Sequence, residues 1–490
     1  MKLVKNFLSI NTLNFLINII LFLFVLKNLD VNKFYLFIFY LSSFFLVFFS
    51  FNFKTIFFEK FLSIFLWLGF PFKLAIPYVA INFGYDVKLF PEVSSNLNFS
   101  KEVYDDAILF ASCGIFGFIC ASKIRKKFLF YYPKKTNLIK NNLYFIYNKH
   151  KSRILIFFSL IFLLTTFLNL YFEIYQKGIS SEFSSKFLVN TFKWLLLMGL
   201  SSFTCLFVYY DIINKKNFKF SSFTFLLESF FSNISTLSRS FVFNVGLLFL
   251  IYFYKFKNNF KTKLPTLVII ATSAIILIFI NINISSKFRA CVVNYLDITK
   301  SEKIFFSKNC LSNKEKIVQQ NKSNTIKNIS SLSISRWVGI DSMMAIMNNK
   351  SELSFEYYKF FLKEKKINDE KSYYEKYFLN HSKKVDRIIN TNHLILPGFI
   401  SYQSITGSKI FVFISCFILG LMGAYLEKIS YIYSFNNFVI SAFISYLFVF
   451  RMIHFGYIPS NTFVYLLSII FTFIQFRVYE FVLSKLRIEK

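Results

Sequence analysis

Residues 154–172 read ILIFFSLIFLLTTFLNLYF, a run without a single charged side chain. Because a helix of about 20 apolar residues crosses the hydrocarbon core of a bilayer, this run predicts a membrane span. The preceding segment, 123–153, carries ten Lys and Arg side chains and no acid. Short loops rich in basic residues stay on the cytoplasmic side of a membrane. Together the two segments predict a span and its orientation.

The composition of the whole chain is that of a membrane protein. Of its 490 residues, 55% are hydrophobic and 21% aromatic, and the mean hydropathy is +0.50. An ordinary soluble enzyme would not hide 73 phenylalanines in its core. The formal net charge is +32. The basic residues lie mostly between apolar runs, where they indicate topology and contact with anionic membrane lipids rather than nucleic-acid binding.

Apolar runs recur along the chain and predict the fold class. We expect an all-α, polytopic integral membrane protein with about 12 transmembrane helices and one long, partly helical external loop. The runs are 7–26, 34–53, 61–81, 107–122, 154–172, 188–210, 221–235, 240–254, 264–284, 410–426, 438–453 and 462–480.

Charge between the runs predicts the topology. Lys and Arg collect in the short segments that this layout places inside, so the positive-inside rule puts both termini in the cytoplasm. The predicted organisation is a membrane domain over 1–284 with nine helices, a large external loop over 285–409, and a second membrane part over 410–490 with three helices. Long loops cross the membrane largely regardless of charge, so the basic residues of the loop do not oppose this orientation.

Parts of the external loop are predicted to be structured. Apolar residues recur at helical spacing in RWVGIDSMMAIMNN (336–349), which predicts a short amphipathic helix. The stretch 351–380 is rich in Tyr, Phe, Lys and Glu and indicates helices near the membrane surface. The stretch 392–409 is apolar but interrupted by Pro397, Gly398 and Gly407, which indicates a re-entrant or interfacial segment.

Signatures of soluble enzymes are missing from the sequence. It contains no phosphate-binding glycine loop, no HExxH, no CxxC and no GxSxG. An ATP-driven pump is therefore not expected, and the absence of a ligand-spaced His, Cys and acid cluster means that we expect neither a metal nor another cofactor.

Ionisable residues at membrane depth are costly unless they are paired or functional. Lys73 lies within the third predicted span and Glu228 lies at the centre of the short seventh one, so a buried pair between them is one possibility. Lys193 lies near the outer end of the sixth span, where its amine can reach the interface. Cys291 and Cys310 both fall in the external loop. On an oxidising side they could form a disulfide worth roughly 3 kcal/mol, and two unpaired thiols are the alternative.

Arginines near the outer surface are the candidate binding groups. Arg239 lies in the short turn between the seventh and eighth spans, and Arg451 lies where the chain leaves the eleventh. Arg336 and Arg387 lie in the external loop. A guanidinium binds phosphate through two parallel hydrogen bonds and does not lose its proton. These residues therefore suit a lipid diphosphate, although contact with ordinary lipid phosphates is the alternative.

Five short segments, in this order, resemble bacterial oligosaccharide repeat unit polymerases, the O-antigen polymerases of the Wzy type. They are FLWLGFPFKLAI (65–76), STLSRS (235–240), RWVGIDSMMAIM (336–347), LPGFISYQSITGSKIFVF (396–413) and RMIHFGYIP (451–459). The interval from Arg387 to Gly398 also matches the R-x10-G spacing of that family.

The resemblance implies a glycosyltransferase that builds O-antigen or capsule-type polysaccharide of the cell envelope at the outer face of the bacterial inner membrane. The donor would be a growing glycan on undecaprenyl diphosphate, and the acceptor a hydroxyl of a new lipid-linked repeat unit. A flippase and a chain-length regulator would be partners. Membrane lipids would surround the protein.

Roles for individual residues follow from that chemistry. Fixed cations must stabilise the departing diphosphate, and Arg239, Arg336 and Arg451 are the candidates. The attacking hydroxyl needs a general base, for which Asp341 and His454 are both open. The candidates for substrate binding are Lys73, Arg387 and His393.

Two other classes of function fit the same layout. A polysaccharide flippase or another transporter also has about twelve spans, but rarely needs so long an external loop. An O-antigen ligase or another lipid-dependent glycosyltransferase would share the substrate chemistry. Many such transferases place essential acids in the first external loop, which here offers only Asp30.

Overall fold

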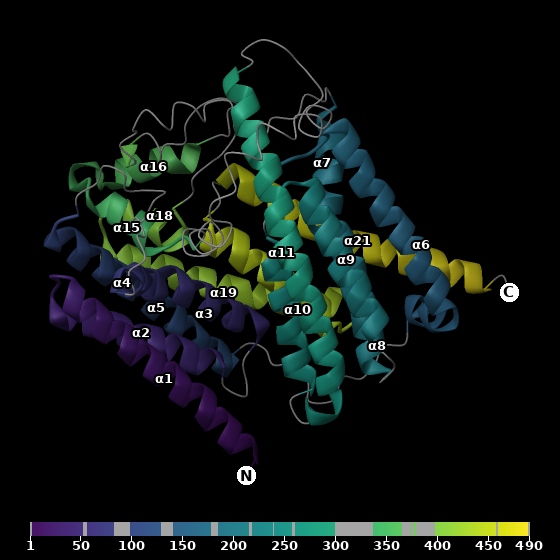
Figure 1. The fold of residues 1–490 in the computed structure, drawn as a ribbon, viewed down its shortest axis with the longest axis horizontal. Coiled ribbons are helices and arrows are strands. Elements are labelled where there is room, and N and C mark those ends of the chain that lie inside the picture. The colour runs from purple at the N-terminus through teal and green to yellow at the C-terminus, as the bar shows by residue number, and fades with distance from the viewer. Residues whose placement is uncertain are drawn as a thin grey trace.

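The computed structural model describes most of the chain, and every regular element in that part is helical (Figure 1). The described residues are 2–51, 56–82, 99–128, 141–177, 185–214, 218–238, 240–256, 260–298, 337–364, 374, 377–378, 397–456 and 459–488.

The first half of the chain contains helices α1 to α11 and two π-helical segments, η1 and η2. Their bounds are α1 Lys2–Asn28, α2 Lys33–Ser50, α3 Phe57–Trp67, η1 Leu68–Phe72, α4 Lys73–Asn82, α5 Lys101–Phe128, α6 Asn142–Phe172, α7 Lys186–Trp194, η2 Leu195–Gly199, α8 Leu200–Ile213, α9 Lys219–Ser235, α10 Phe241–Phe256 and α11 Phe260–Ile298.

The second half contains short helices in the predicted external loop and then long helices. Their bounds are α15 Ile340–Met347, the 3₁₀ turn η3 Lys350–Glu352, α16 Phe355–Lys363, α18 Phe399–Ser404, α19 Lys409–Tyr433, α20 Phe438–Phe448, the π-helical η5 Val449–His454 and α21 Pro459–Ile488.

Nine helical stretches among the described residues are long and apolar enough to cross a membrane, so the prediction of an all-α membrane protein is confirmed at this level. Two of the other predicted runs correspond to shorter apolar helices, Phe241–Phe256 and Phe438–His454, and the third corresponds to α9. The nine are Asn11–Asn28, Lys33–Ser50, Phe57–Ala80, Lys101–Lys126, Asn142–Phe172, Lys186–Ile213, Leu264–Ser285, Lys409–Tyr433 and Thr462–Val482.

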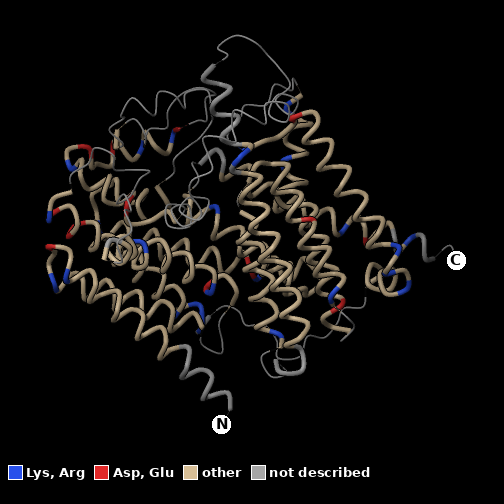
Figure 2. Tube along the Cα trace, in the orientation of Figure 1, with Lys and Arg blue, Asp and Glu red and all other residues tan. Residues whose placement is uncertain are grey.

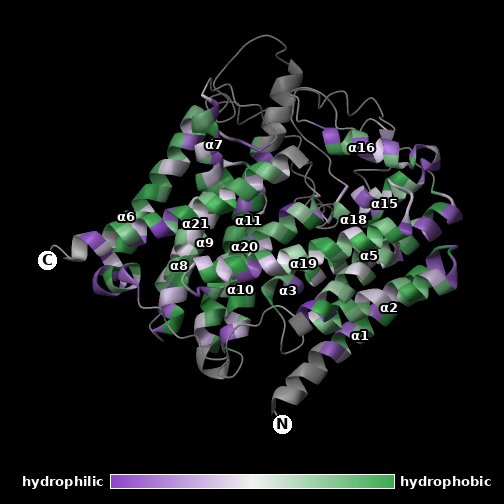
Figure 3. Cartoon of the chain, turned by 180° about the vertical axis from the view of Figure 1, so that it is seen from behind, coloured by the Kyte–Doolittle hydropathy of each residue, from purple (hydrophilic) through white to green (hydrophobic). Residues whose placement is uncertain are grey.

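The helices form two groups that α20 joins. Helices α1, α2, α3, α5 and α19 lie side by side in one group, and α6 and α8 to α11 run more steeply in the other (Figure 1). α20 packs on α8 and α10 of the second group and on α3 and α19 of the first. Most residues of the described helices are hydrophobic (Figure 3), whereas the charged residues of these helices lie mainly near their ends (Figure 2).

Small residues bring α5 and α19 into close contact. A Cβ atom on Gly117 would lie 2.4 Å from the carbonyl oxygen of Phe413, and one on Gly420 would lie 2.7 Å from Cβ of Ala121. Close approach of backbones through small residues is the usual way that membrane helices gain packing energy, because lipid gives no hydrophobic drive between them.

Buried carboxylates at helix ends hold this packing together. The two oxygens of Glu427 accept hydrogen bonds from the Phe57 and Phe58 amides at 2.9 and 2.6 Å, which satisfies the first turn of α3. Glu59 and Arg125 form a buried pair with two parallel hydrogen bonds of 2.7 and 2.8 Å. Such planar pairs between α3 and α5 set the relative position of the two helices.

Two described helices of the predicted external loop, α15 and α18, pack into the helical body. The helix expected within 336–349 is present as α15, but it is not amphipathic, because all eight of its residues are buried. α18 lies in the apolar stretch 392–409 and is also largely buried. α11 continues to Ile298, beyond the end of its apolar run at 284.

Candidate functional site

The described chain contains three π-helical segments, and each lies beside a group of polar side chains. η1 ends immediately before Lys73, η5 carries Arg451 and His454, and η2 lies beside α9. π-helical turns are rare in proteins and are frequent at functional sites.

Lys73 and Asp341 form a buried ion pair. Nζ of Lys73 lies 2.7 Å from Oδ2 of Asp341, and both side chains are at most 4% exposed. The amine also donates to the backbone carbonyl of Trp337. Lys73 therefore does not pair with Glu228, which was one possibility from the sequence. Its partner is the Asp341 carboxylate of α15.

Two glycines let α15 approach η1. A Cβ atom on Gly69 would lie 2.3 Å from the Val338 carbonyl oxygen, and one on Gly339 would lie 2.0 Å from the Gly69 carbonyl oxygen. Ser401 of α18 donates a hydrogen bond of 3.3 Å to the Gly339 carbonyl. The loop helix is thus wedged between backbone atoms of the third span and α18.

His454 lies among aromatic rings. Its ring centroid is 5.0 Å from that of Phe65, 5.8 Å from that of Trp337 and 4.9 Å from that of Phe455. The Gly398 amide donates to the Phe455 carbonyl at 3.2 Å, which ties the end of the external loop to η5. His454 is 3% exposed, and neither it nor Asp341 lines the polar pocket described next.

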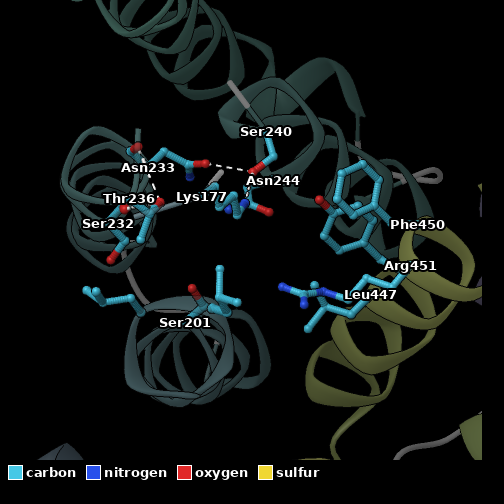
Figure 4. Close-up of a pocket in the computed structure, with 13 residues that line it drawn as sticks. Lys177, Ser201, Ser232, Asn233, Thr236, Ser240, Asn244, Leu447, Phe450 and Arg451 are labelled. Carbon is cyan, nitrogen blue, oxygen red and sulfur yellow. Dashed lines mark hydrogen bonds between the residues drawn. The ribbon is translucent and has the colours of Figure 1, made fainter. Parts of the chain in front are cut away.

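Phe450, which contacts the His454 ring, also lines a polar pocket. Arg451 extends from η5 toward Ser201 of α8, while residues of α9 and α10 close the opposite side (Figure 4). The cavity has a volume of about 30 Å³, which exceeds the roughly 10–15 Å³ that one water molecule needs. Its lining is Lys177, Leu196, Leu197, Ser201, Ser232, Asn233, Thr236, Ser240, Asn244, Tyr446, Leu447, Phe450 and Arg451.

A chain of hydrogen bonds runs from Lys177 along the pocket. Nζ of Lys177 donates to Oγ of Ser238 at 2.7 Å and lies 3.4 Å from Oγ of Ser240. Ser240 donates to Oδ1 of Asn233 at 2.7 Å. Nδ2 of Asn244 donates to Oγ of Ser229 at 3.1 Å. The polar side chains of α9 and α10 therefore hold one another in place.

Glu228 lies behind the pocket wall. Its carboxylate accepts a hydrogen bond of 2.8 Å from Ser201 and one of 2.9 Å from Ser232, and both serines line the pocket. The side chain is fully buried. A buried carboxylate requires such donors, because burial without hydrogen bonds costs several kcal/mol.

An aromatic cluster connects the surroundings of the Lys73–Asp341 pair with the polar pocket. Phe243 packs on Trp337 with ring centroids 5.5 Å apart and on Phe450 with centroids 4.8 Å apart. These ring contacts connect Trp337, whose carbonyl accepts from Lys73, with Phe450, which lines the polar pocket. The structure brings Lys73 together with Asp341, and places Arg451 in the polar pocket and His454 among the aromatic rings.

Several predicted site residues lie outside the described part of the chain. They are Arg239, Arg336, Arg387, His393 and Cys310, while only the backbone of Cys291 is described. Sequence reasoning missed Lys177, Ser201, Ser232 and Asn244. One signal was available, since SNIST (232–236) ends an apolar run with three hydroxyl residues and an amide.

The arrangement suits recognition of a polar, partly anionic molecule. Arg451 and Lys177 are half-buried cations, and the hydroxyl and amide groups between them offer hydrogen bonds in fixed directions. Within the described residues, no group of three or more His, Cys, Asp and Glu side chains is placed to hold a metal ion.

Comparison with known proteins adds no family to these observations. No protein-family model, no curated protein and no solved structure matches this chain.

Proposed function

We propose that this protein polymerises undecaprenyl-diphosphate-linked oligosaccharide repeat units into an O-antigen or capsule-type polysaccharide. It would act at the outer face of the bacterial inner membrane, with twelve spans, both termini in the cytoplasm and residues 285–409 outside. The single observation that supports this reading best is Arg451, which lines a polar pocket inside an otherwise apolar helical body.

The chemistry explains why such an arginine is needed. When the glycan leaves its lipid carrier, negative charge develops on the diphosphate, and a preorganised cation in a poorly solvated site stabilises that charge strongly. Arg451 meets these conditions, since its guanidinium is half-buried and lies 5.7 Å from the Tyr465 ring. Lys177 supplies a second positive charge on the same pocket.

Substitution of Arg451 by Lys tests the proposal. Lysine keeps the charge but loses the two-pronged geometry. Loss of a charge-assisted hydrogen bond costs roughly 1.5–3 kcal/mol, which in the transition state is about a 10- to 150-fold loss of rate. We expect single repeat units to accumulate and long chains to disappear when glycans are separated by length.

Arg477→Lys is the matched control. Arg477 lies on α21 with its guanidinium carbon 4.6 Å from the Phe435 ring, and it does not line the pocket. This variant should retain long chains. Normal chain length in a well-inserted Arg451→Lys variant would contradict the site. Transport of single units without any polymer in the wild type would indicate a flippase instead.

A further inference from the structure

The inner wall of the pocket has a defined hydrogen-bonding direction. Ser201 and Ser232 are each 3% exposed and hydrogen-bond to different oxygens of the same carboxylate, that of Glu228. In its ionised form the Glu228 carboxylate only accepts hydrogen bonds, so in that form both serine hydroxyls donate to it. Each hydroxyl has one proton, and that proton is used. The serine oxygens therefore present only lone pairs to the pocket.

The opposite wall has the reverse direction. Arg451 and Lys177, which also line the pocket, carry only donors. The pocket thus has acceptors on the side of Ser201 and Ser232 and donors on the side of Arg451 and Lys177. A group that fits between them must both donate and accept a hydrogen bond.

We infer that the inner end of this pocket receives one uncharged hydroxyl group of a sugar, which donates to Ser201 or Ser232 and accepts from Arg451. The volume of about 30 Å³ admits one such group. A phosphoryl oxygen fits less well, because it only accepts and would face the serine lone pairs and the charge of Glu228. Glu228 is then a positioning residue. This inference rests on the proposed function, since it names the part of the glycan that the pocket binds.

Binding of simple probes to the purified full-length protein in lipid nanodiscs tests the inference. The probes are glucose, galactose, N-acetylglucosamine and inorganic phosphate, and the readout is the shift of the thermal unfolding midpoint, because ligands of the folded state raise it. Sugars also stabilise proteins by exclusion from their surface. Comparison between variants removes that contribution, which is common to all of them.

Ser201→Ala and Ser232→Ala remove the proposed acceptors, and Ser222→Ala is the control. Ser222 is a buried serine of the same helix as Ser232, but it contacts Tyr252 and not the pocket. At least one sugar should bind wild type and Ser222→Ala about tenfold more tightly than the two pocket variants, the loss expected for one hydrogen bond. Phosphate should shift all four proteins equally.

Glu228→Gln gives an independent result. The amide nitrogen donates, so one serine turns its own proton toward the pocket, and the preference for sugar over phosphate should shrink by about tenfold. An equal sugar response in all variants would overturn the inference, as would a phosphate response that depends on the serines. Chain-length analysis of the same proteins separates the two proposals. If sugar binding depends on the serines but no polymer forms, only the proposed polymerase function is refuted. If polymer forms but all variants bind sugar equally, only the proposed hydroxyl site is refuted.

Discussion

Nζ of Lys73 lies 2.7 Å from Oδ2 of Asp341 in the predicted external loop, across 268 positions of sequence. The pair is buried, so it fixes the depth at which α15 enters the helical body. It also occupies one oxygen of a carboxylate that sequence reasoning nominated as a general base. The loop helix is therefore part of the packed membrane structure.

Removal of one partner of this pair should destabilise the protein strongly. Lys73→Met or Asp341→Leu leaves an uncompensated buried charge, which costs about 3–5 kcal/mol, whereas the double variant should recover most of that loss. The thermal unfolding midpoint in detergent measures the effect. Lys101→Met is the control, because its partner Asp30 is 84% exposed and the midpoint should not move. Equal midpoints for the two Lys variants would contradict a structural role for the buried pair.

Close backbone contact between η1 and α15 predicts a steric effect. Gly69→Ala and Gly339→Ala each place a methyl group about 2 Å from a carbonyl oxygen, and such overpacking costs about 1–3 kcal/mol. Gly246→Ala in α10 is the matched control, since nothing lies within 4 Å of its added Cβ atom. That control should be neutral or slightly stabilising, because alanine favours a helix. Indistinguishable unfolding midpoints for Gly69→Ala and Gly246→Ala would show that the contact is loose.

Topology can be tested by reporter fusions. The basic segment 123–153 predicts a cytoplasmic location for Lys140, and the long loop predicts an external location for Asn324. Fusions of alkaline phosphatase and a cytoplasmic fluorescent protein at the two positions should report opposite compartments. The same compartment at both positions would overturn the orientation and, with it, a reaction at the outer face.

Cys291 and Cys310, which are predicted to be external, provide a separate check on the compartment. If Cys291 and Cys310 are joined, maleimide should label them only after reduction, because a disulfide leaves no thiol to react. Cys113 of α5 is a suitable reference, since it is a free, partly buried thiol. Labelling of Cys291 and Cys310 that is independent of reductant would exclude the bond.

Hydropathy and charge alone were sufficient to predict that this protein is an all-α membrane protein. Runs such as 154–172 must be helical within a bilayer, because only a helix satisfies every backbone hydrogen bond inside one segment. Nine of the twelve predicted runs correspond to helices that can span a membrane. A helix within 336–349 was also predicted and is present, but its predicted amphipathic character was wrong.

Only the tertiary structure decided which polar groups meet. Lys73 pairs with Asp341 and not with Glu228, because α15 is buried against η1. Gly69 and Gly339 allow this close contact, since neither carries a side chain. Ser201, Ser232 and Arg451 come from three helices whose crossing no sequence period records. Periodicity reports which face of one helix is apolar; the partner of a buried polar group is set by close packing between helices distant in sequence.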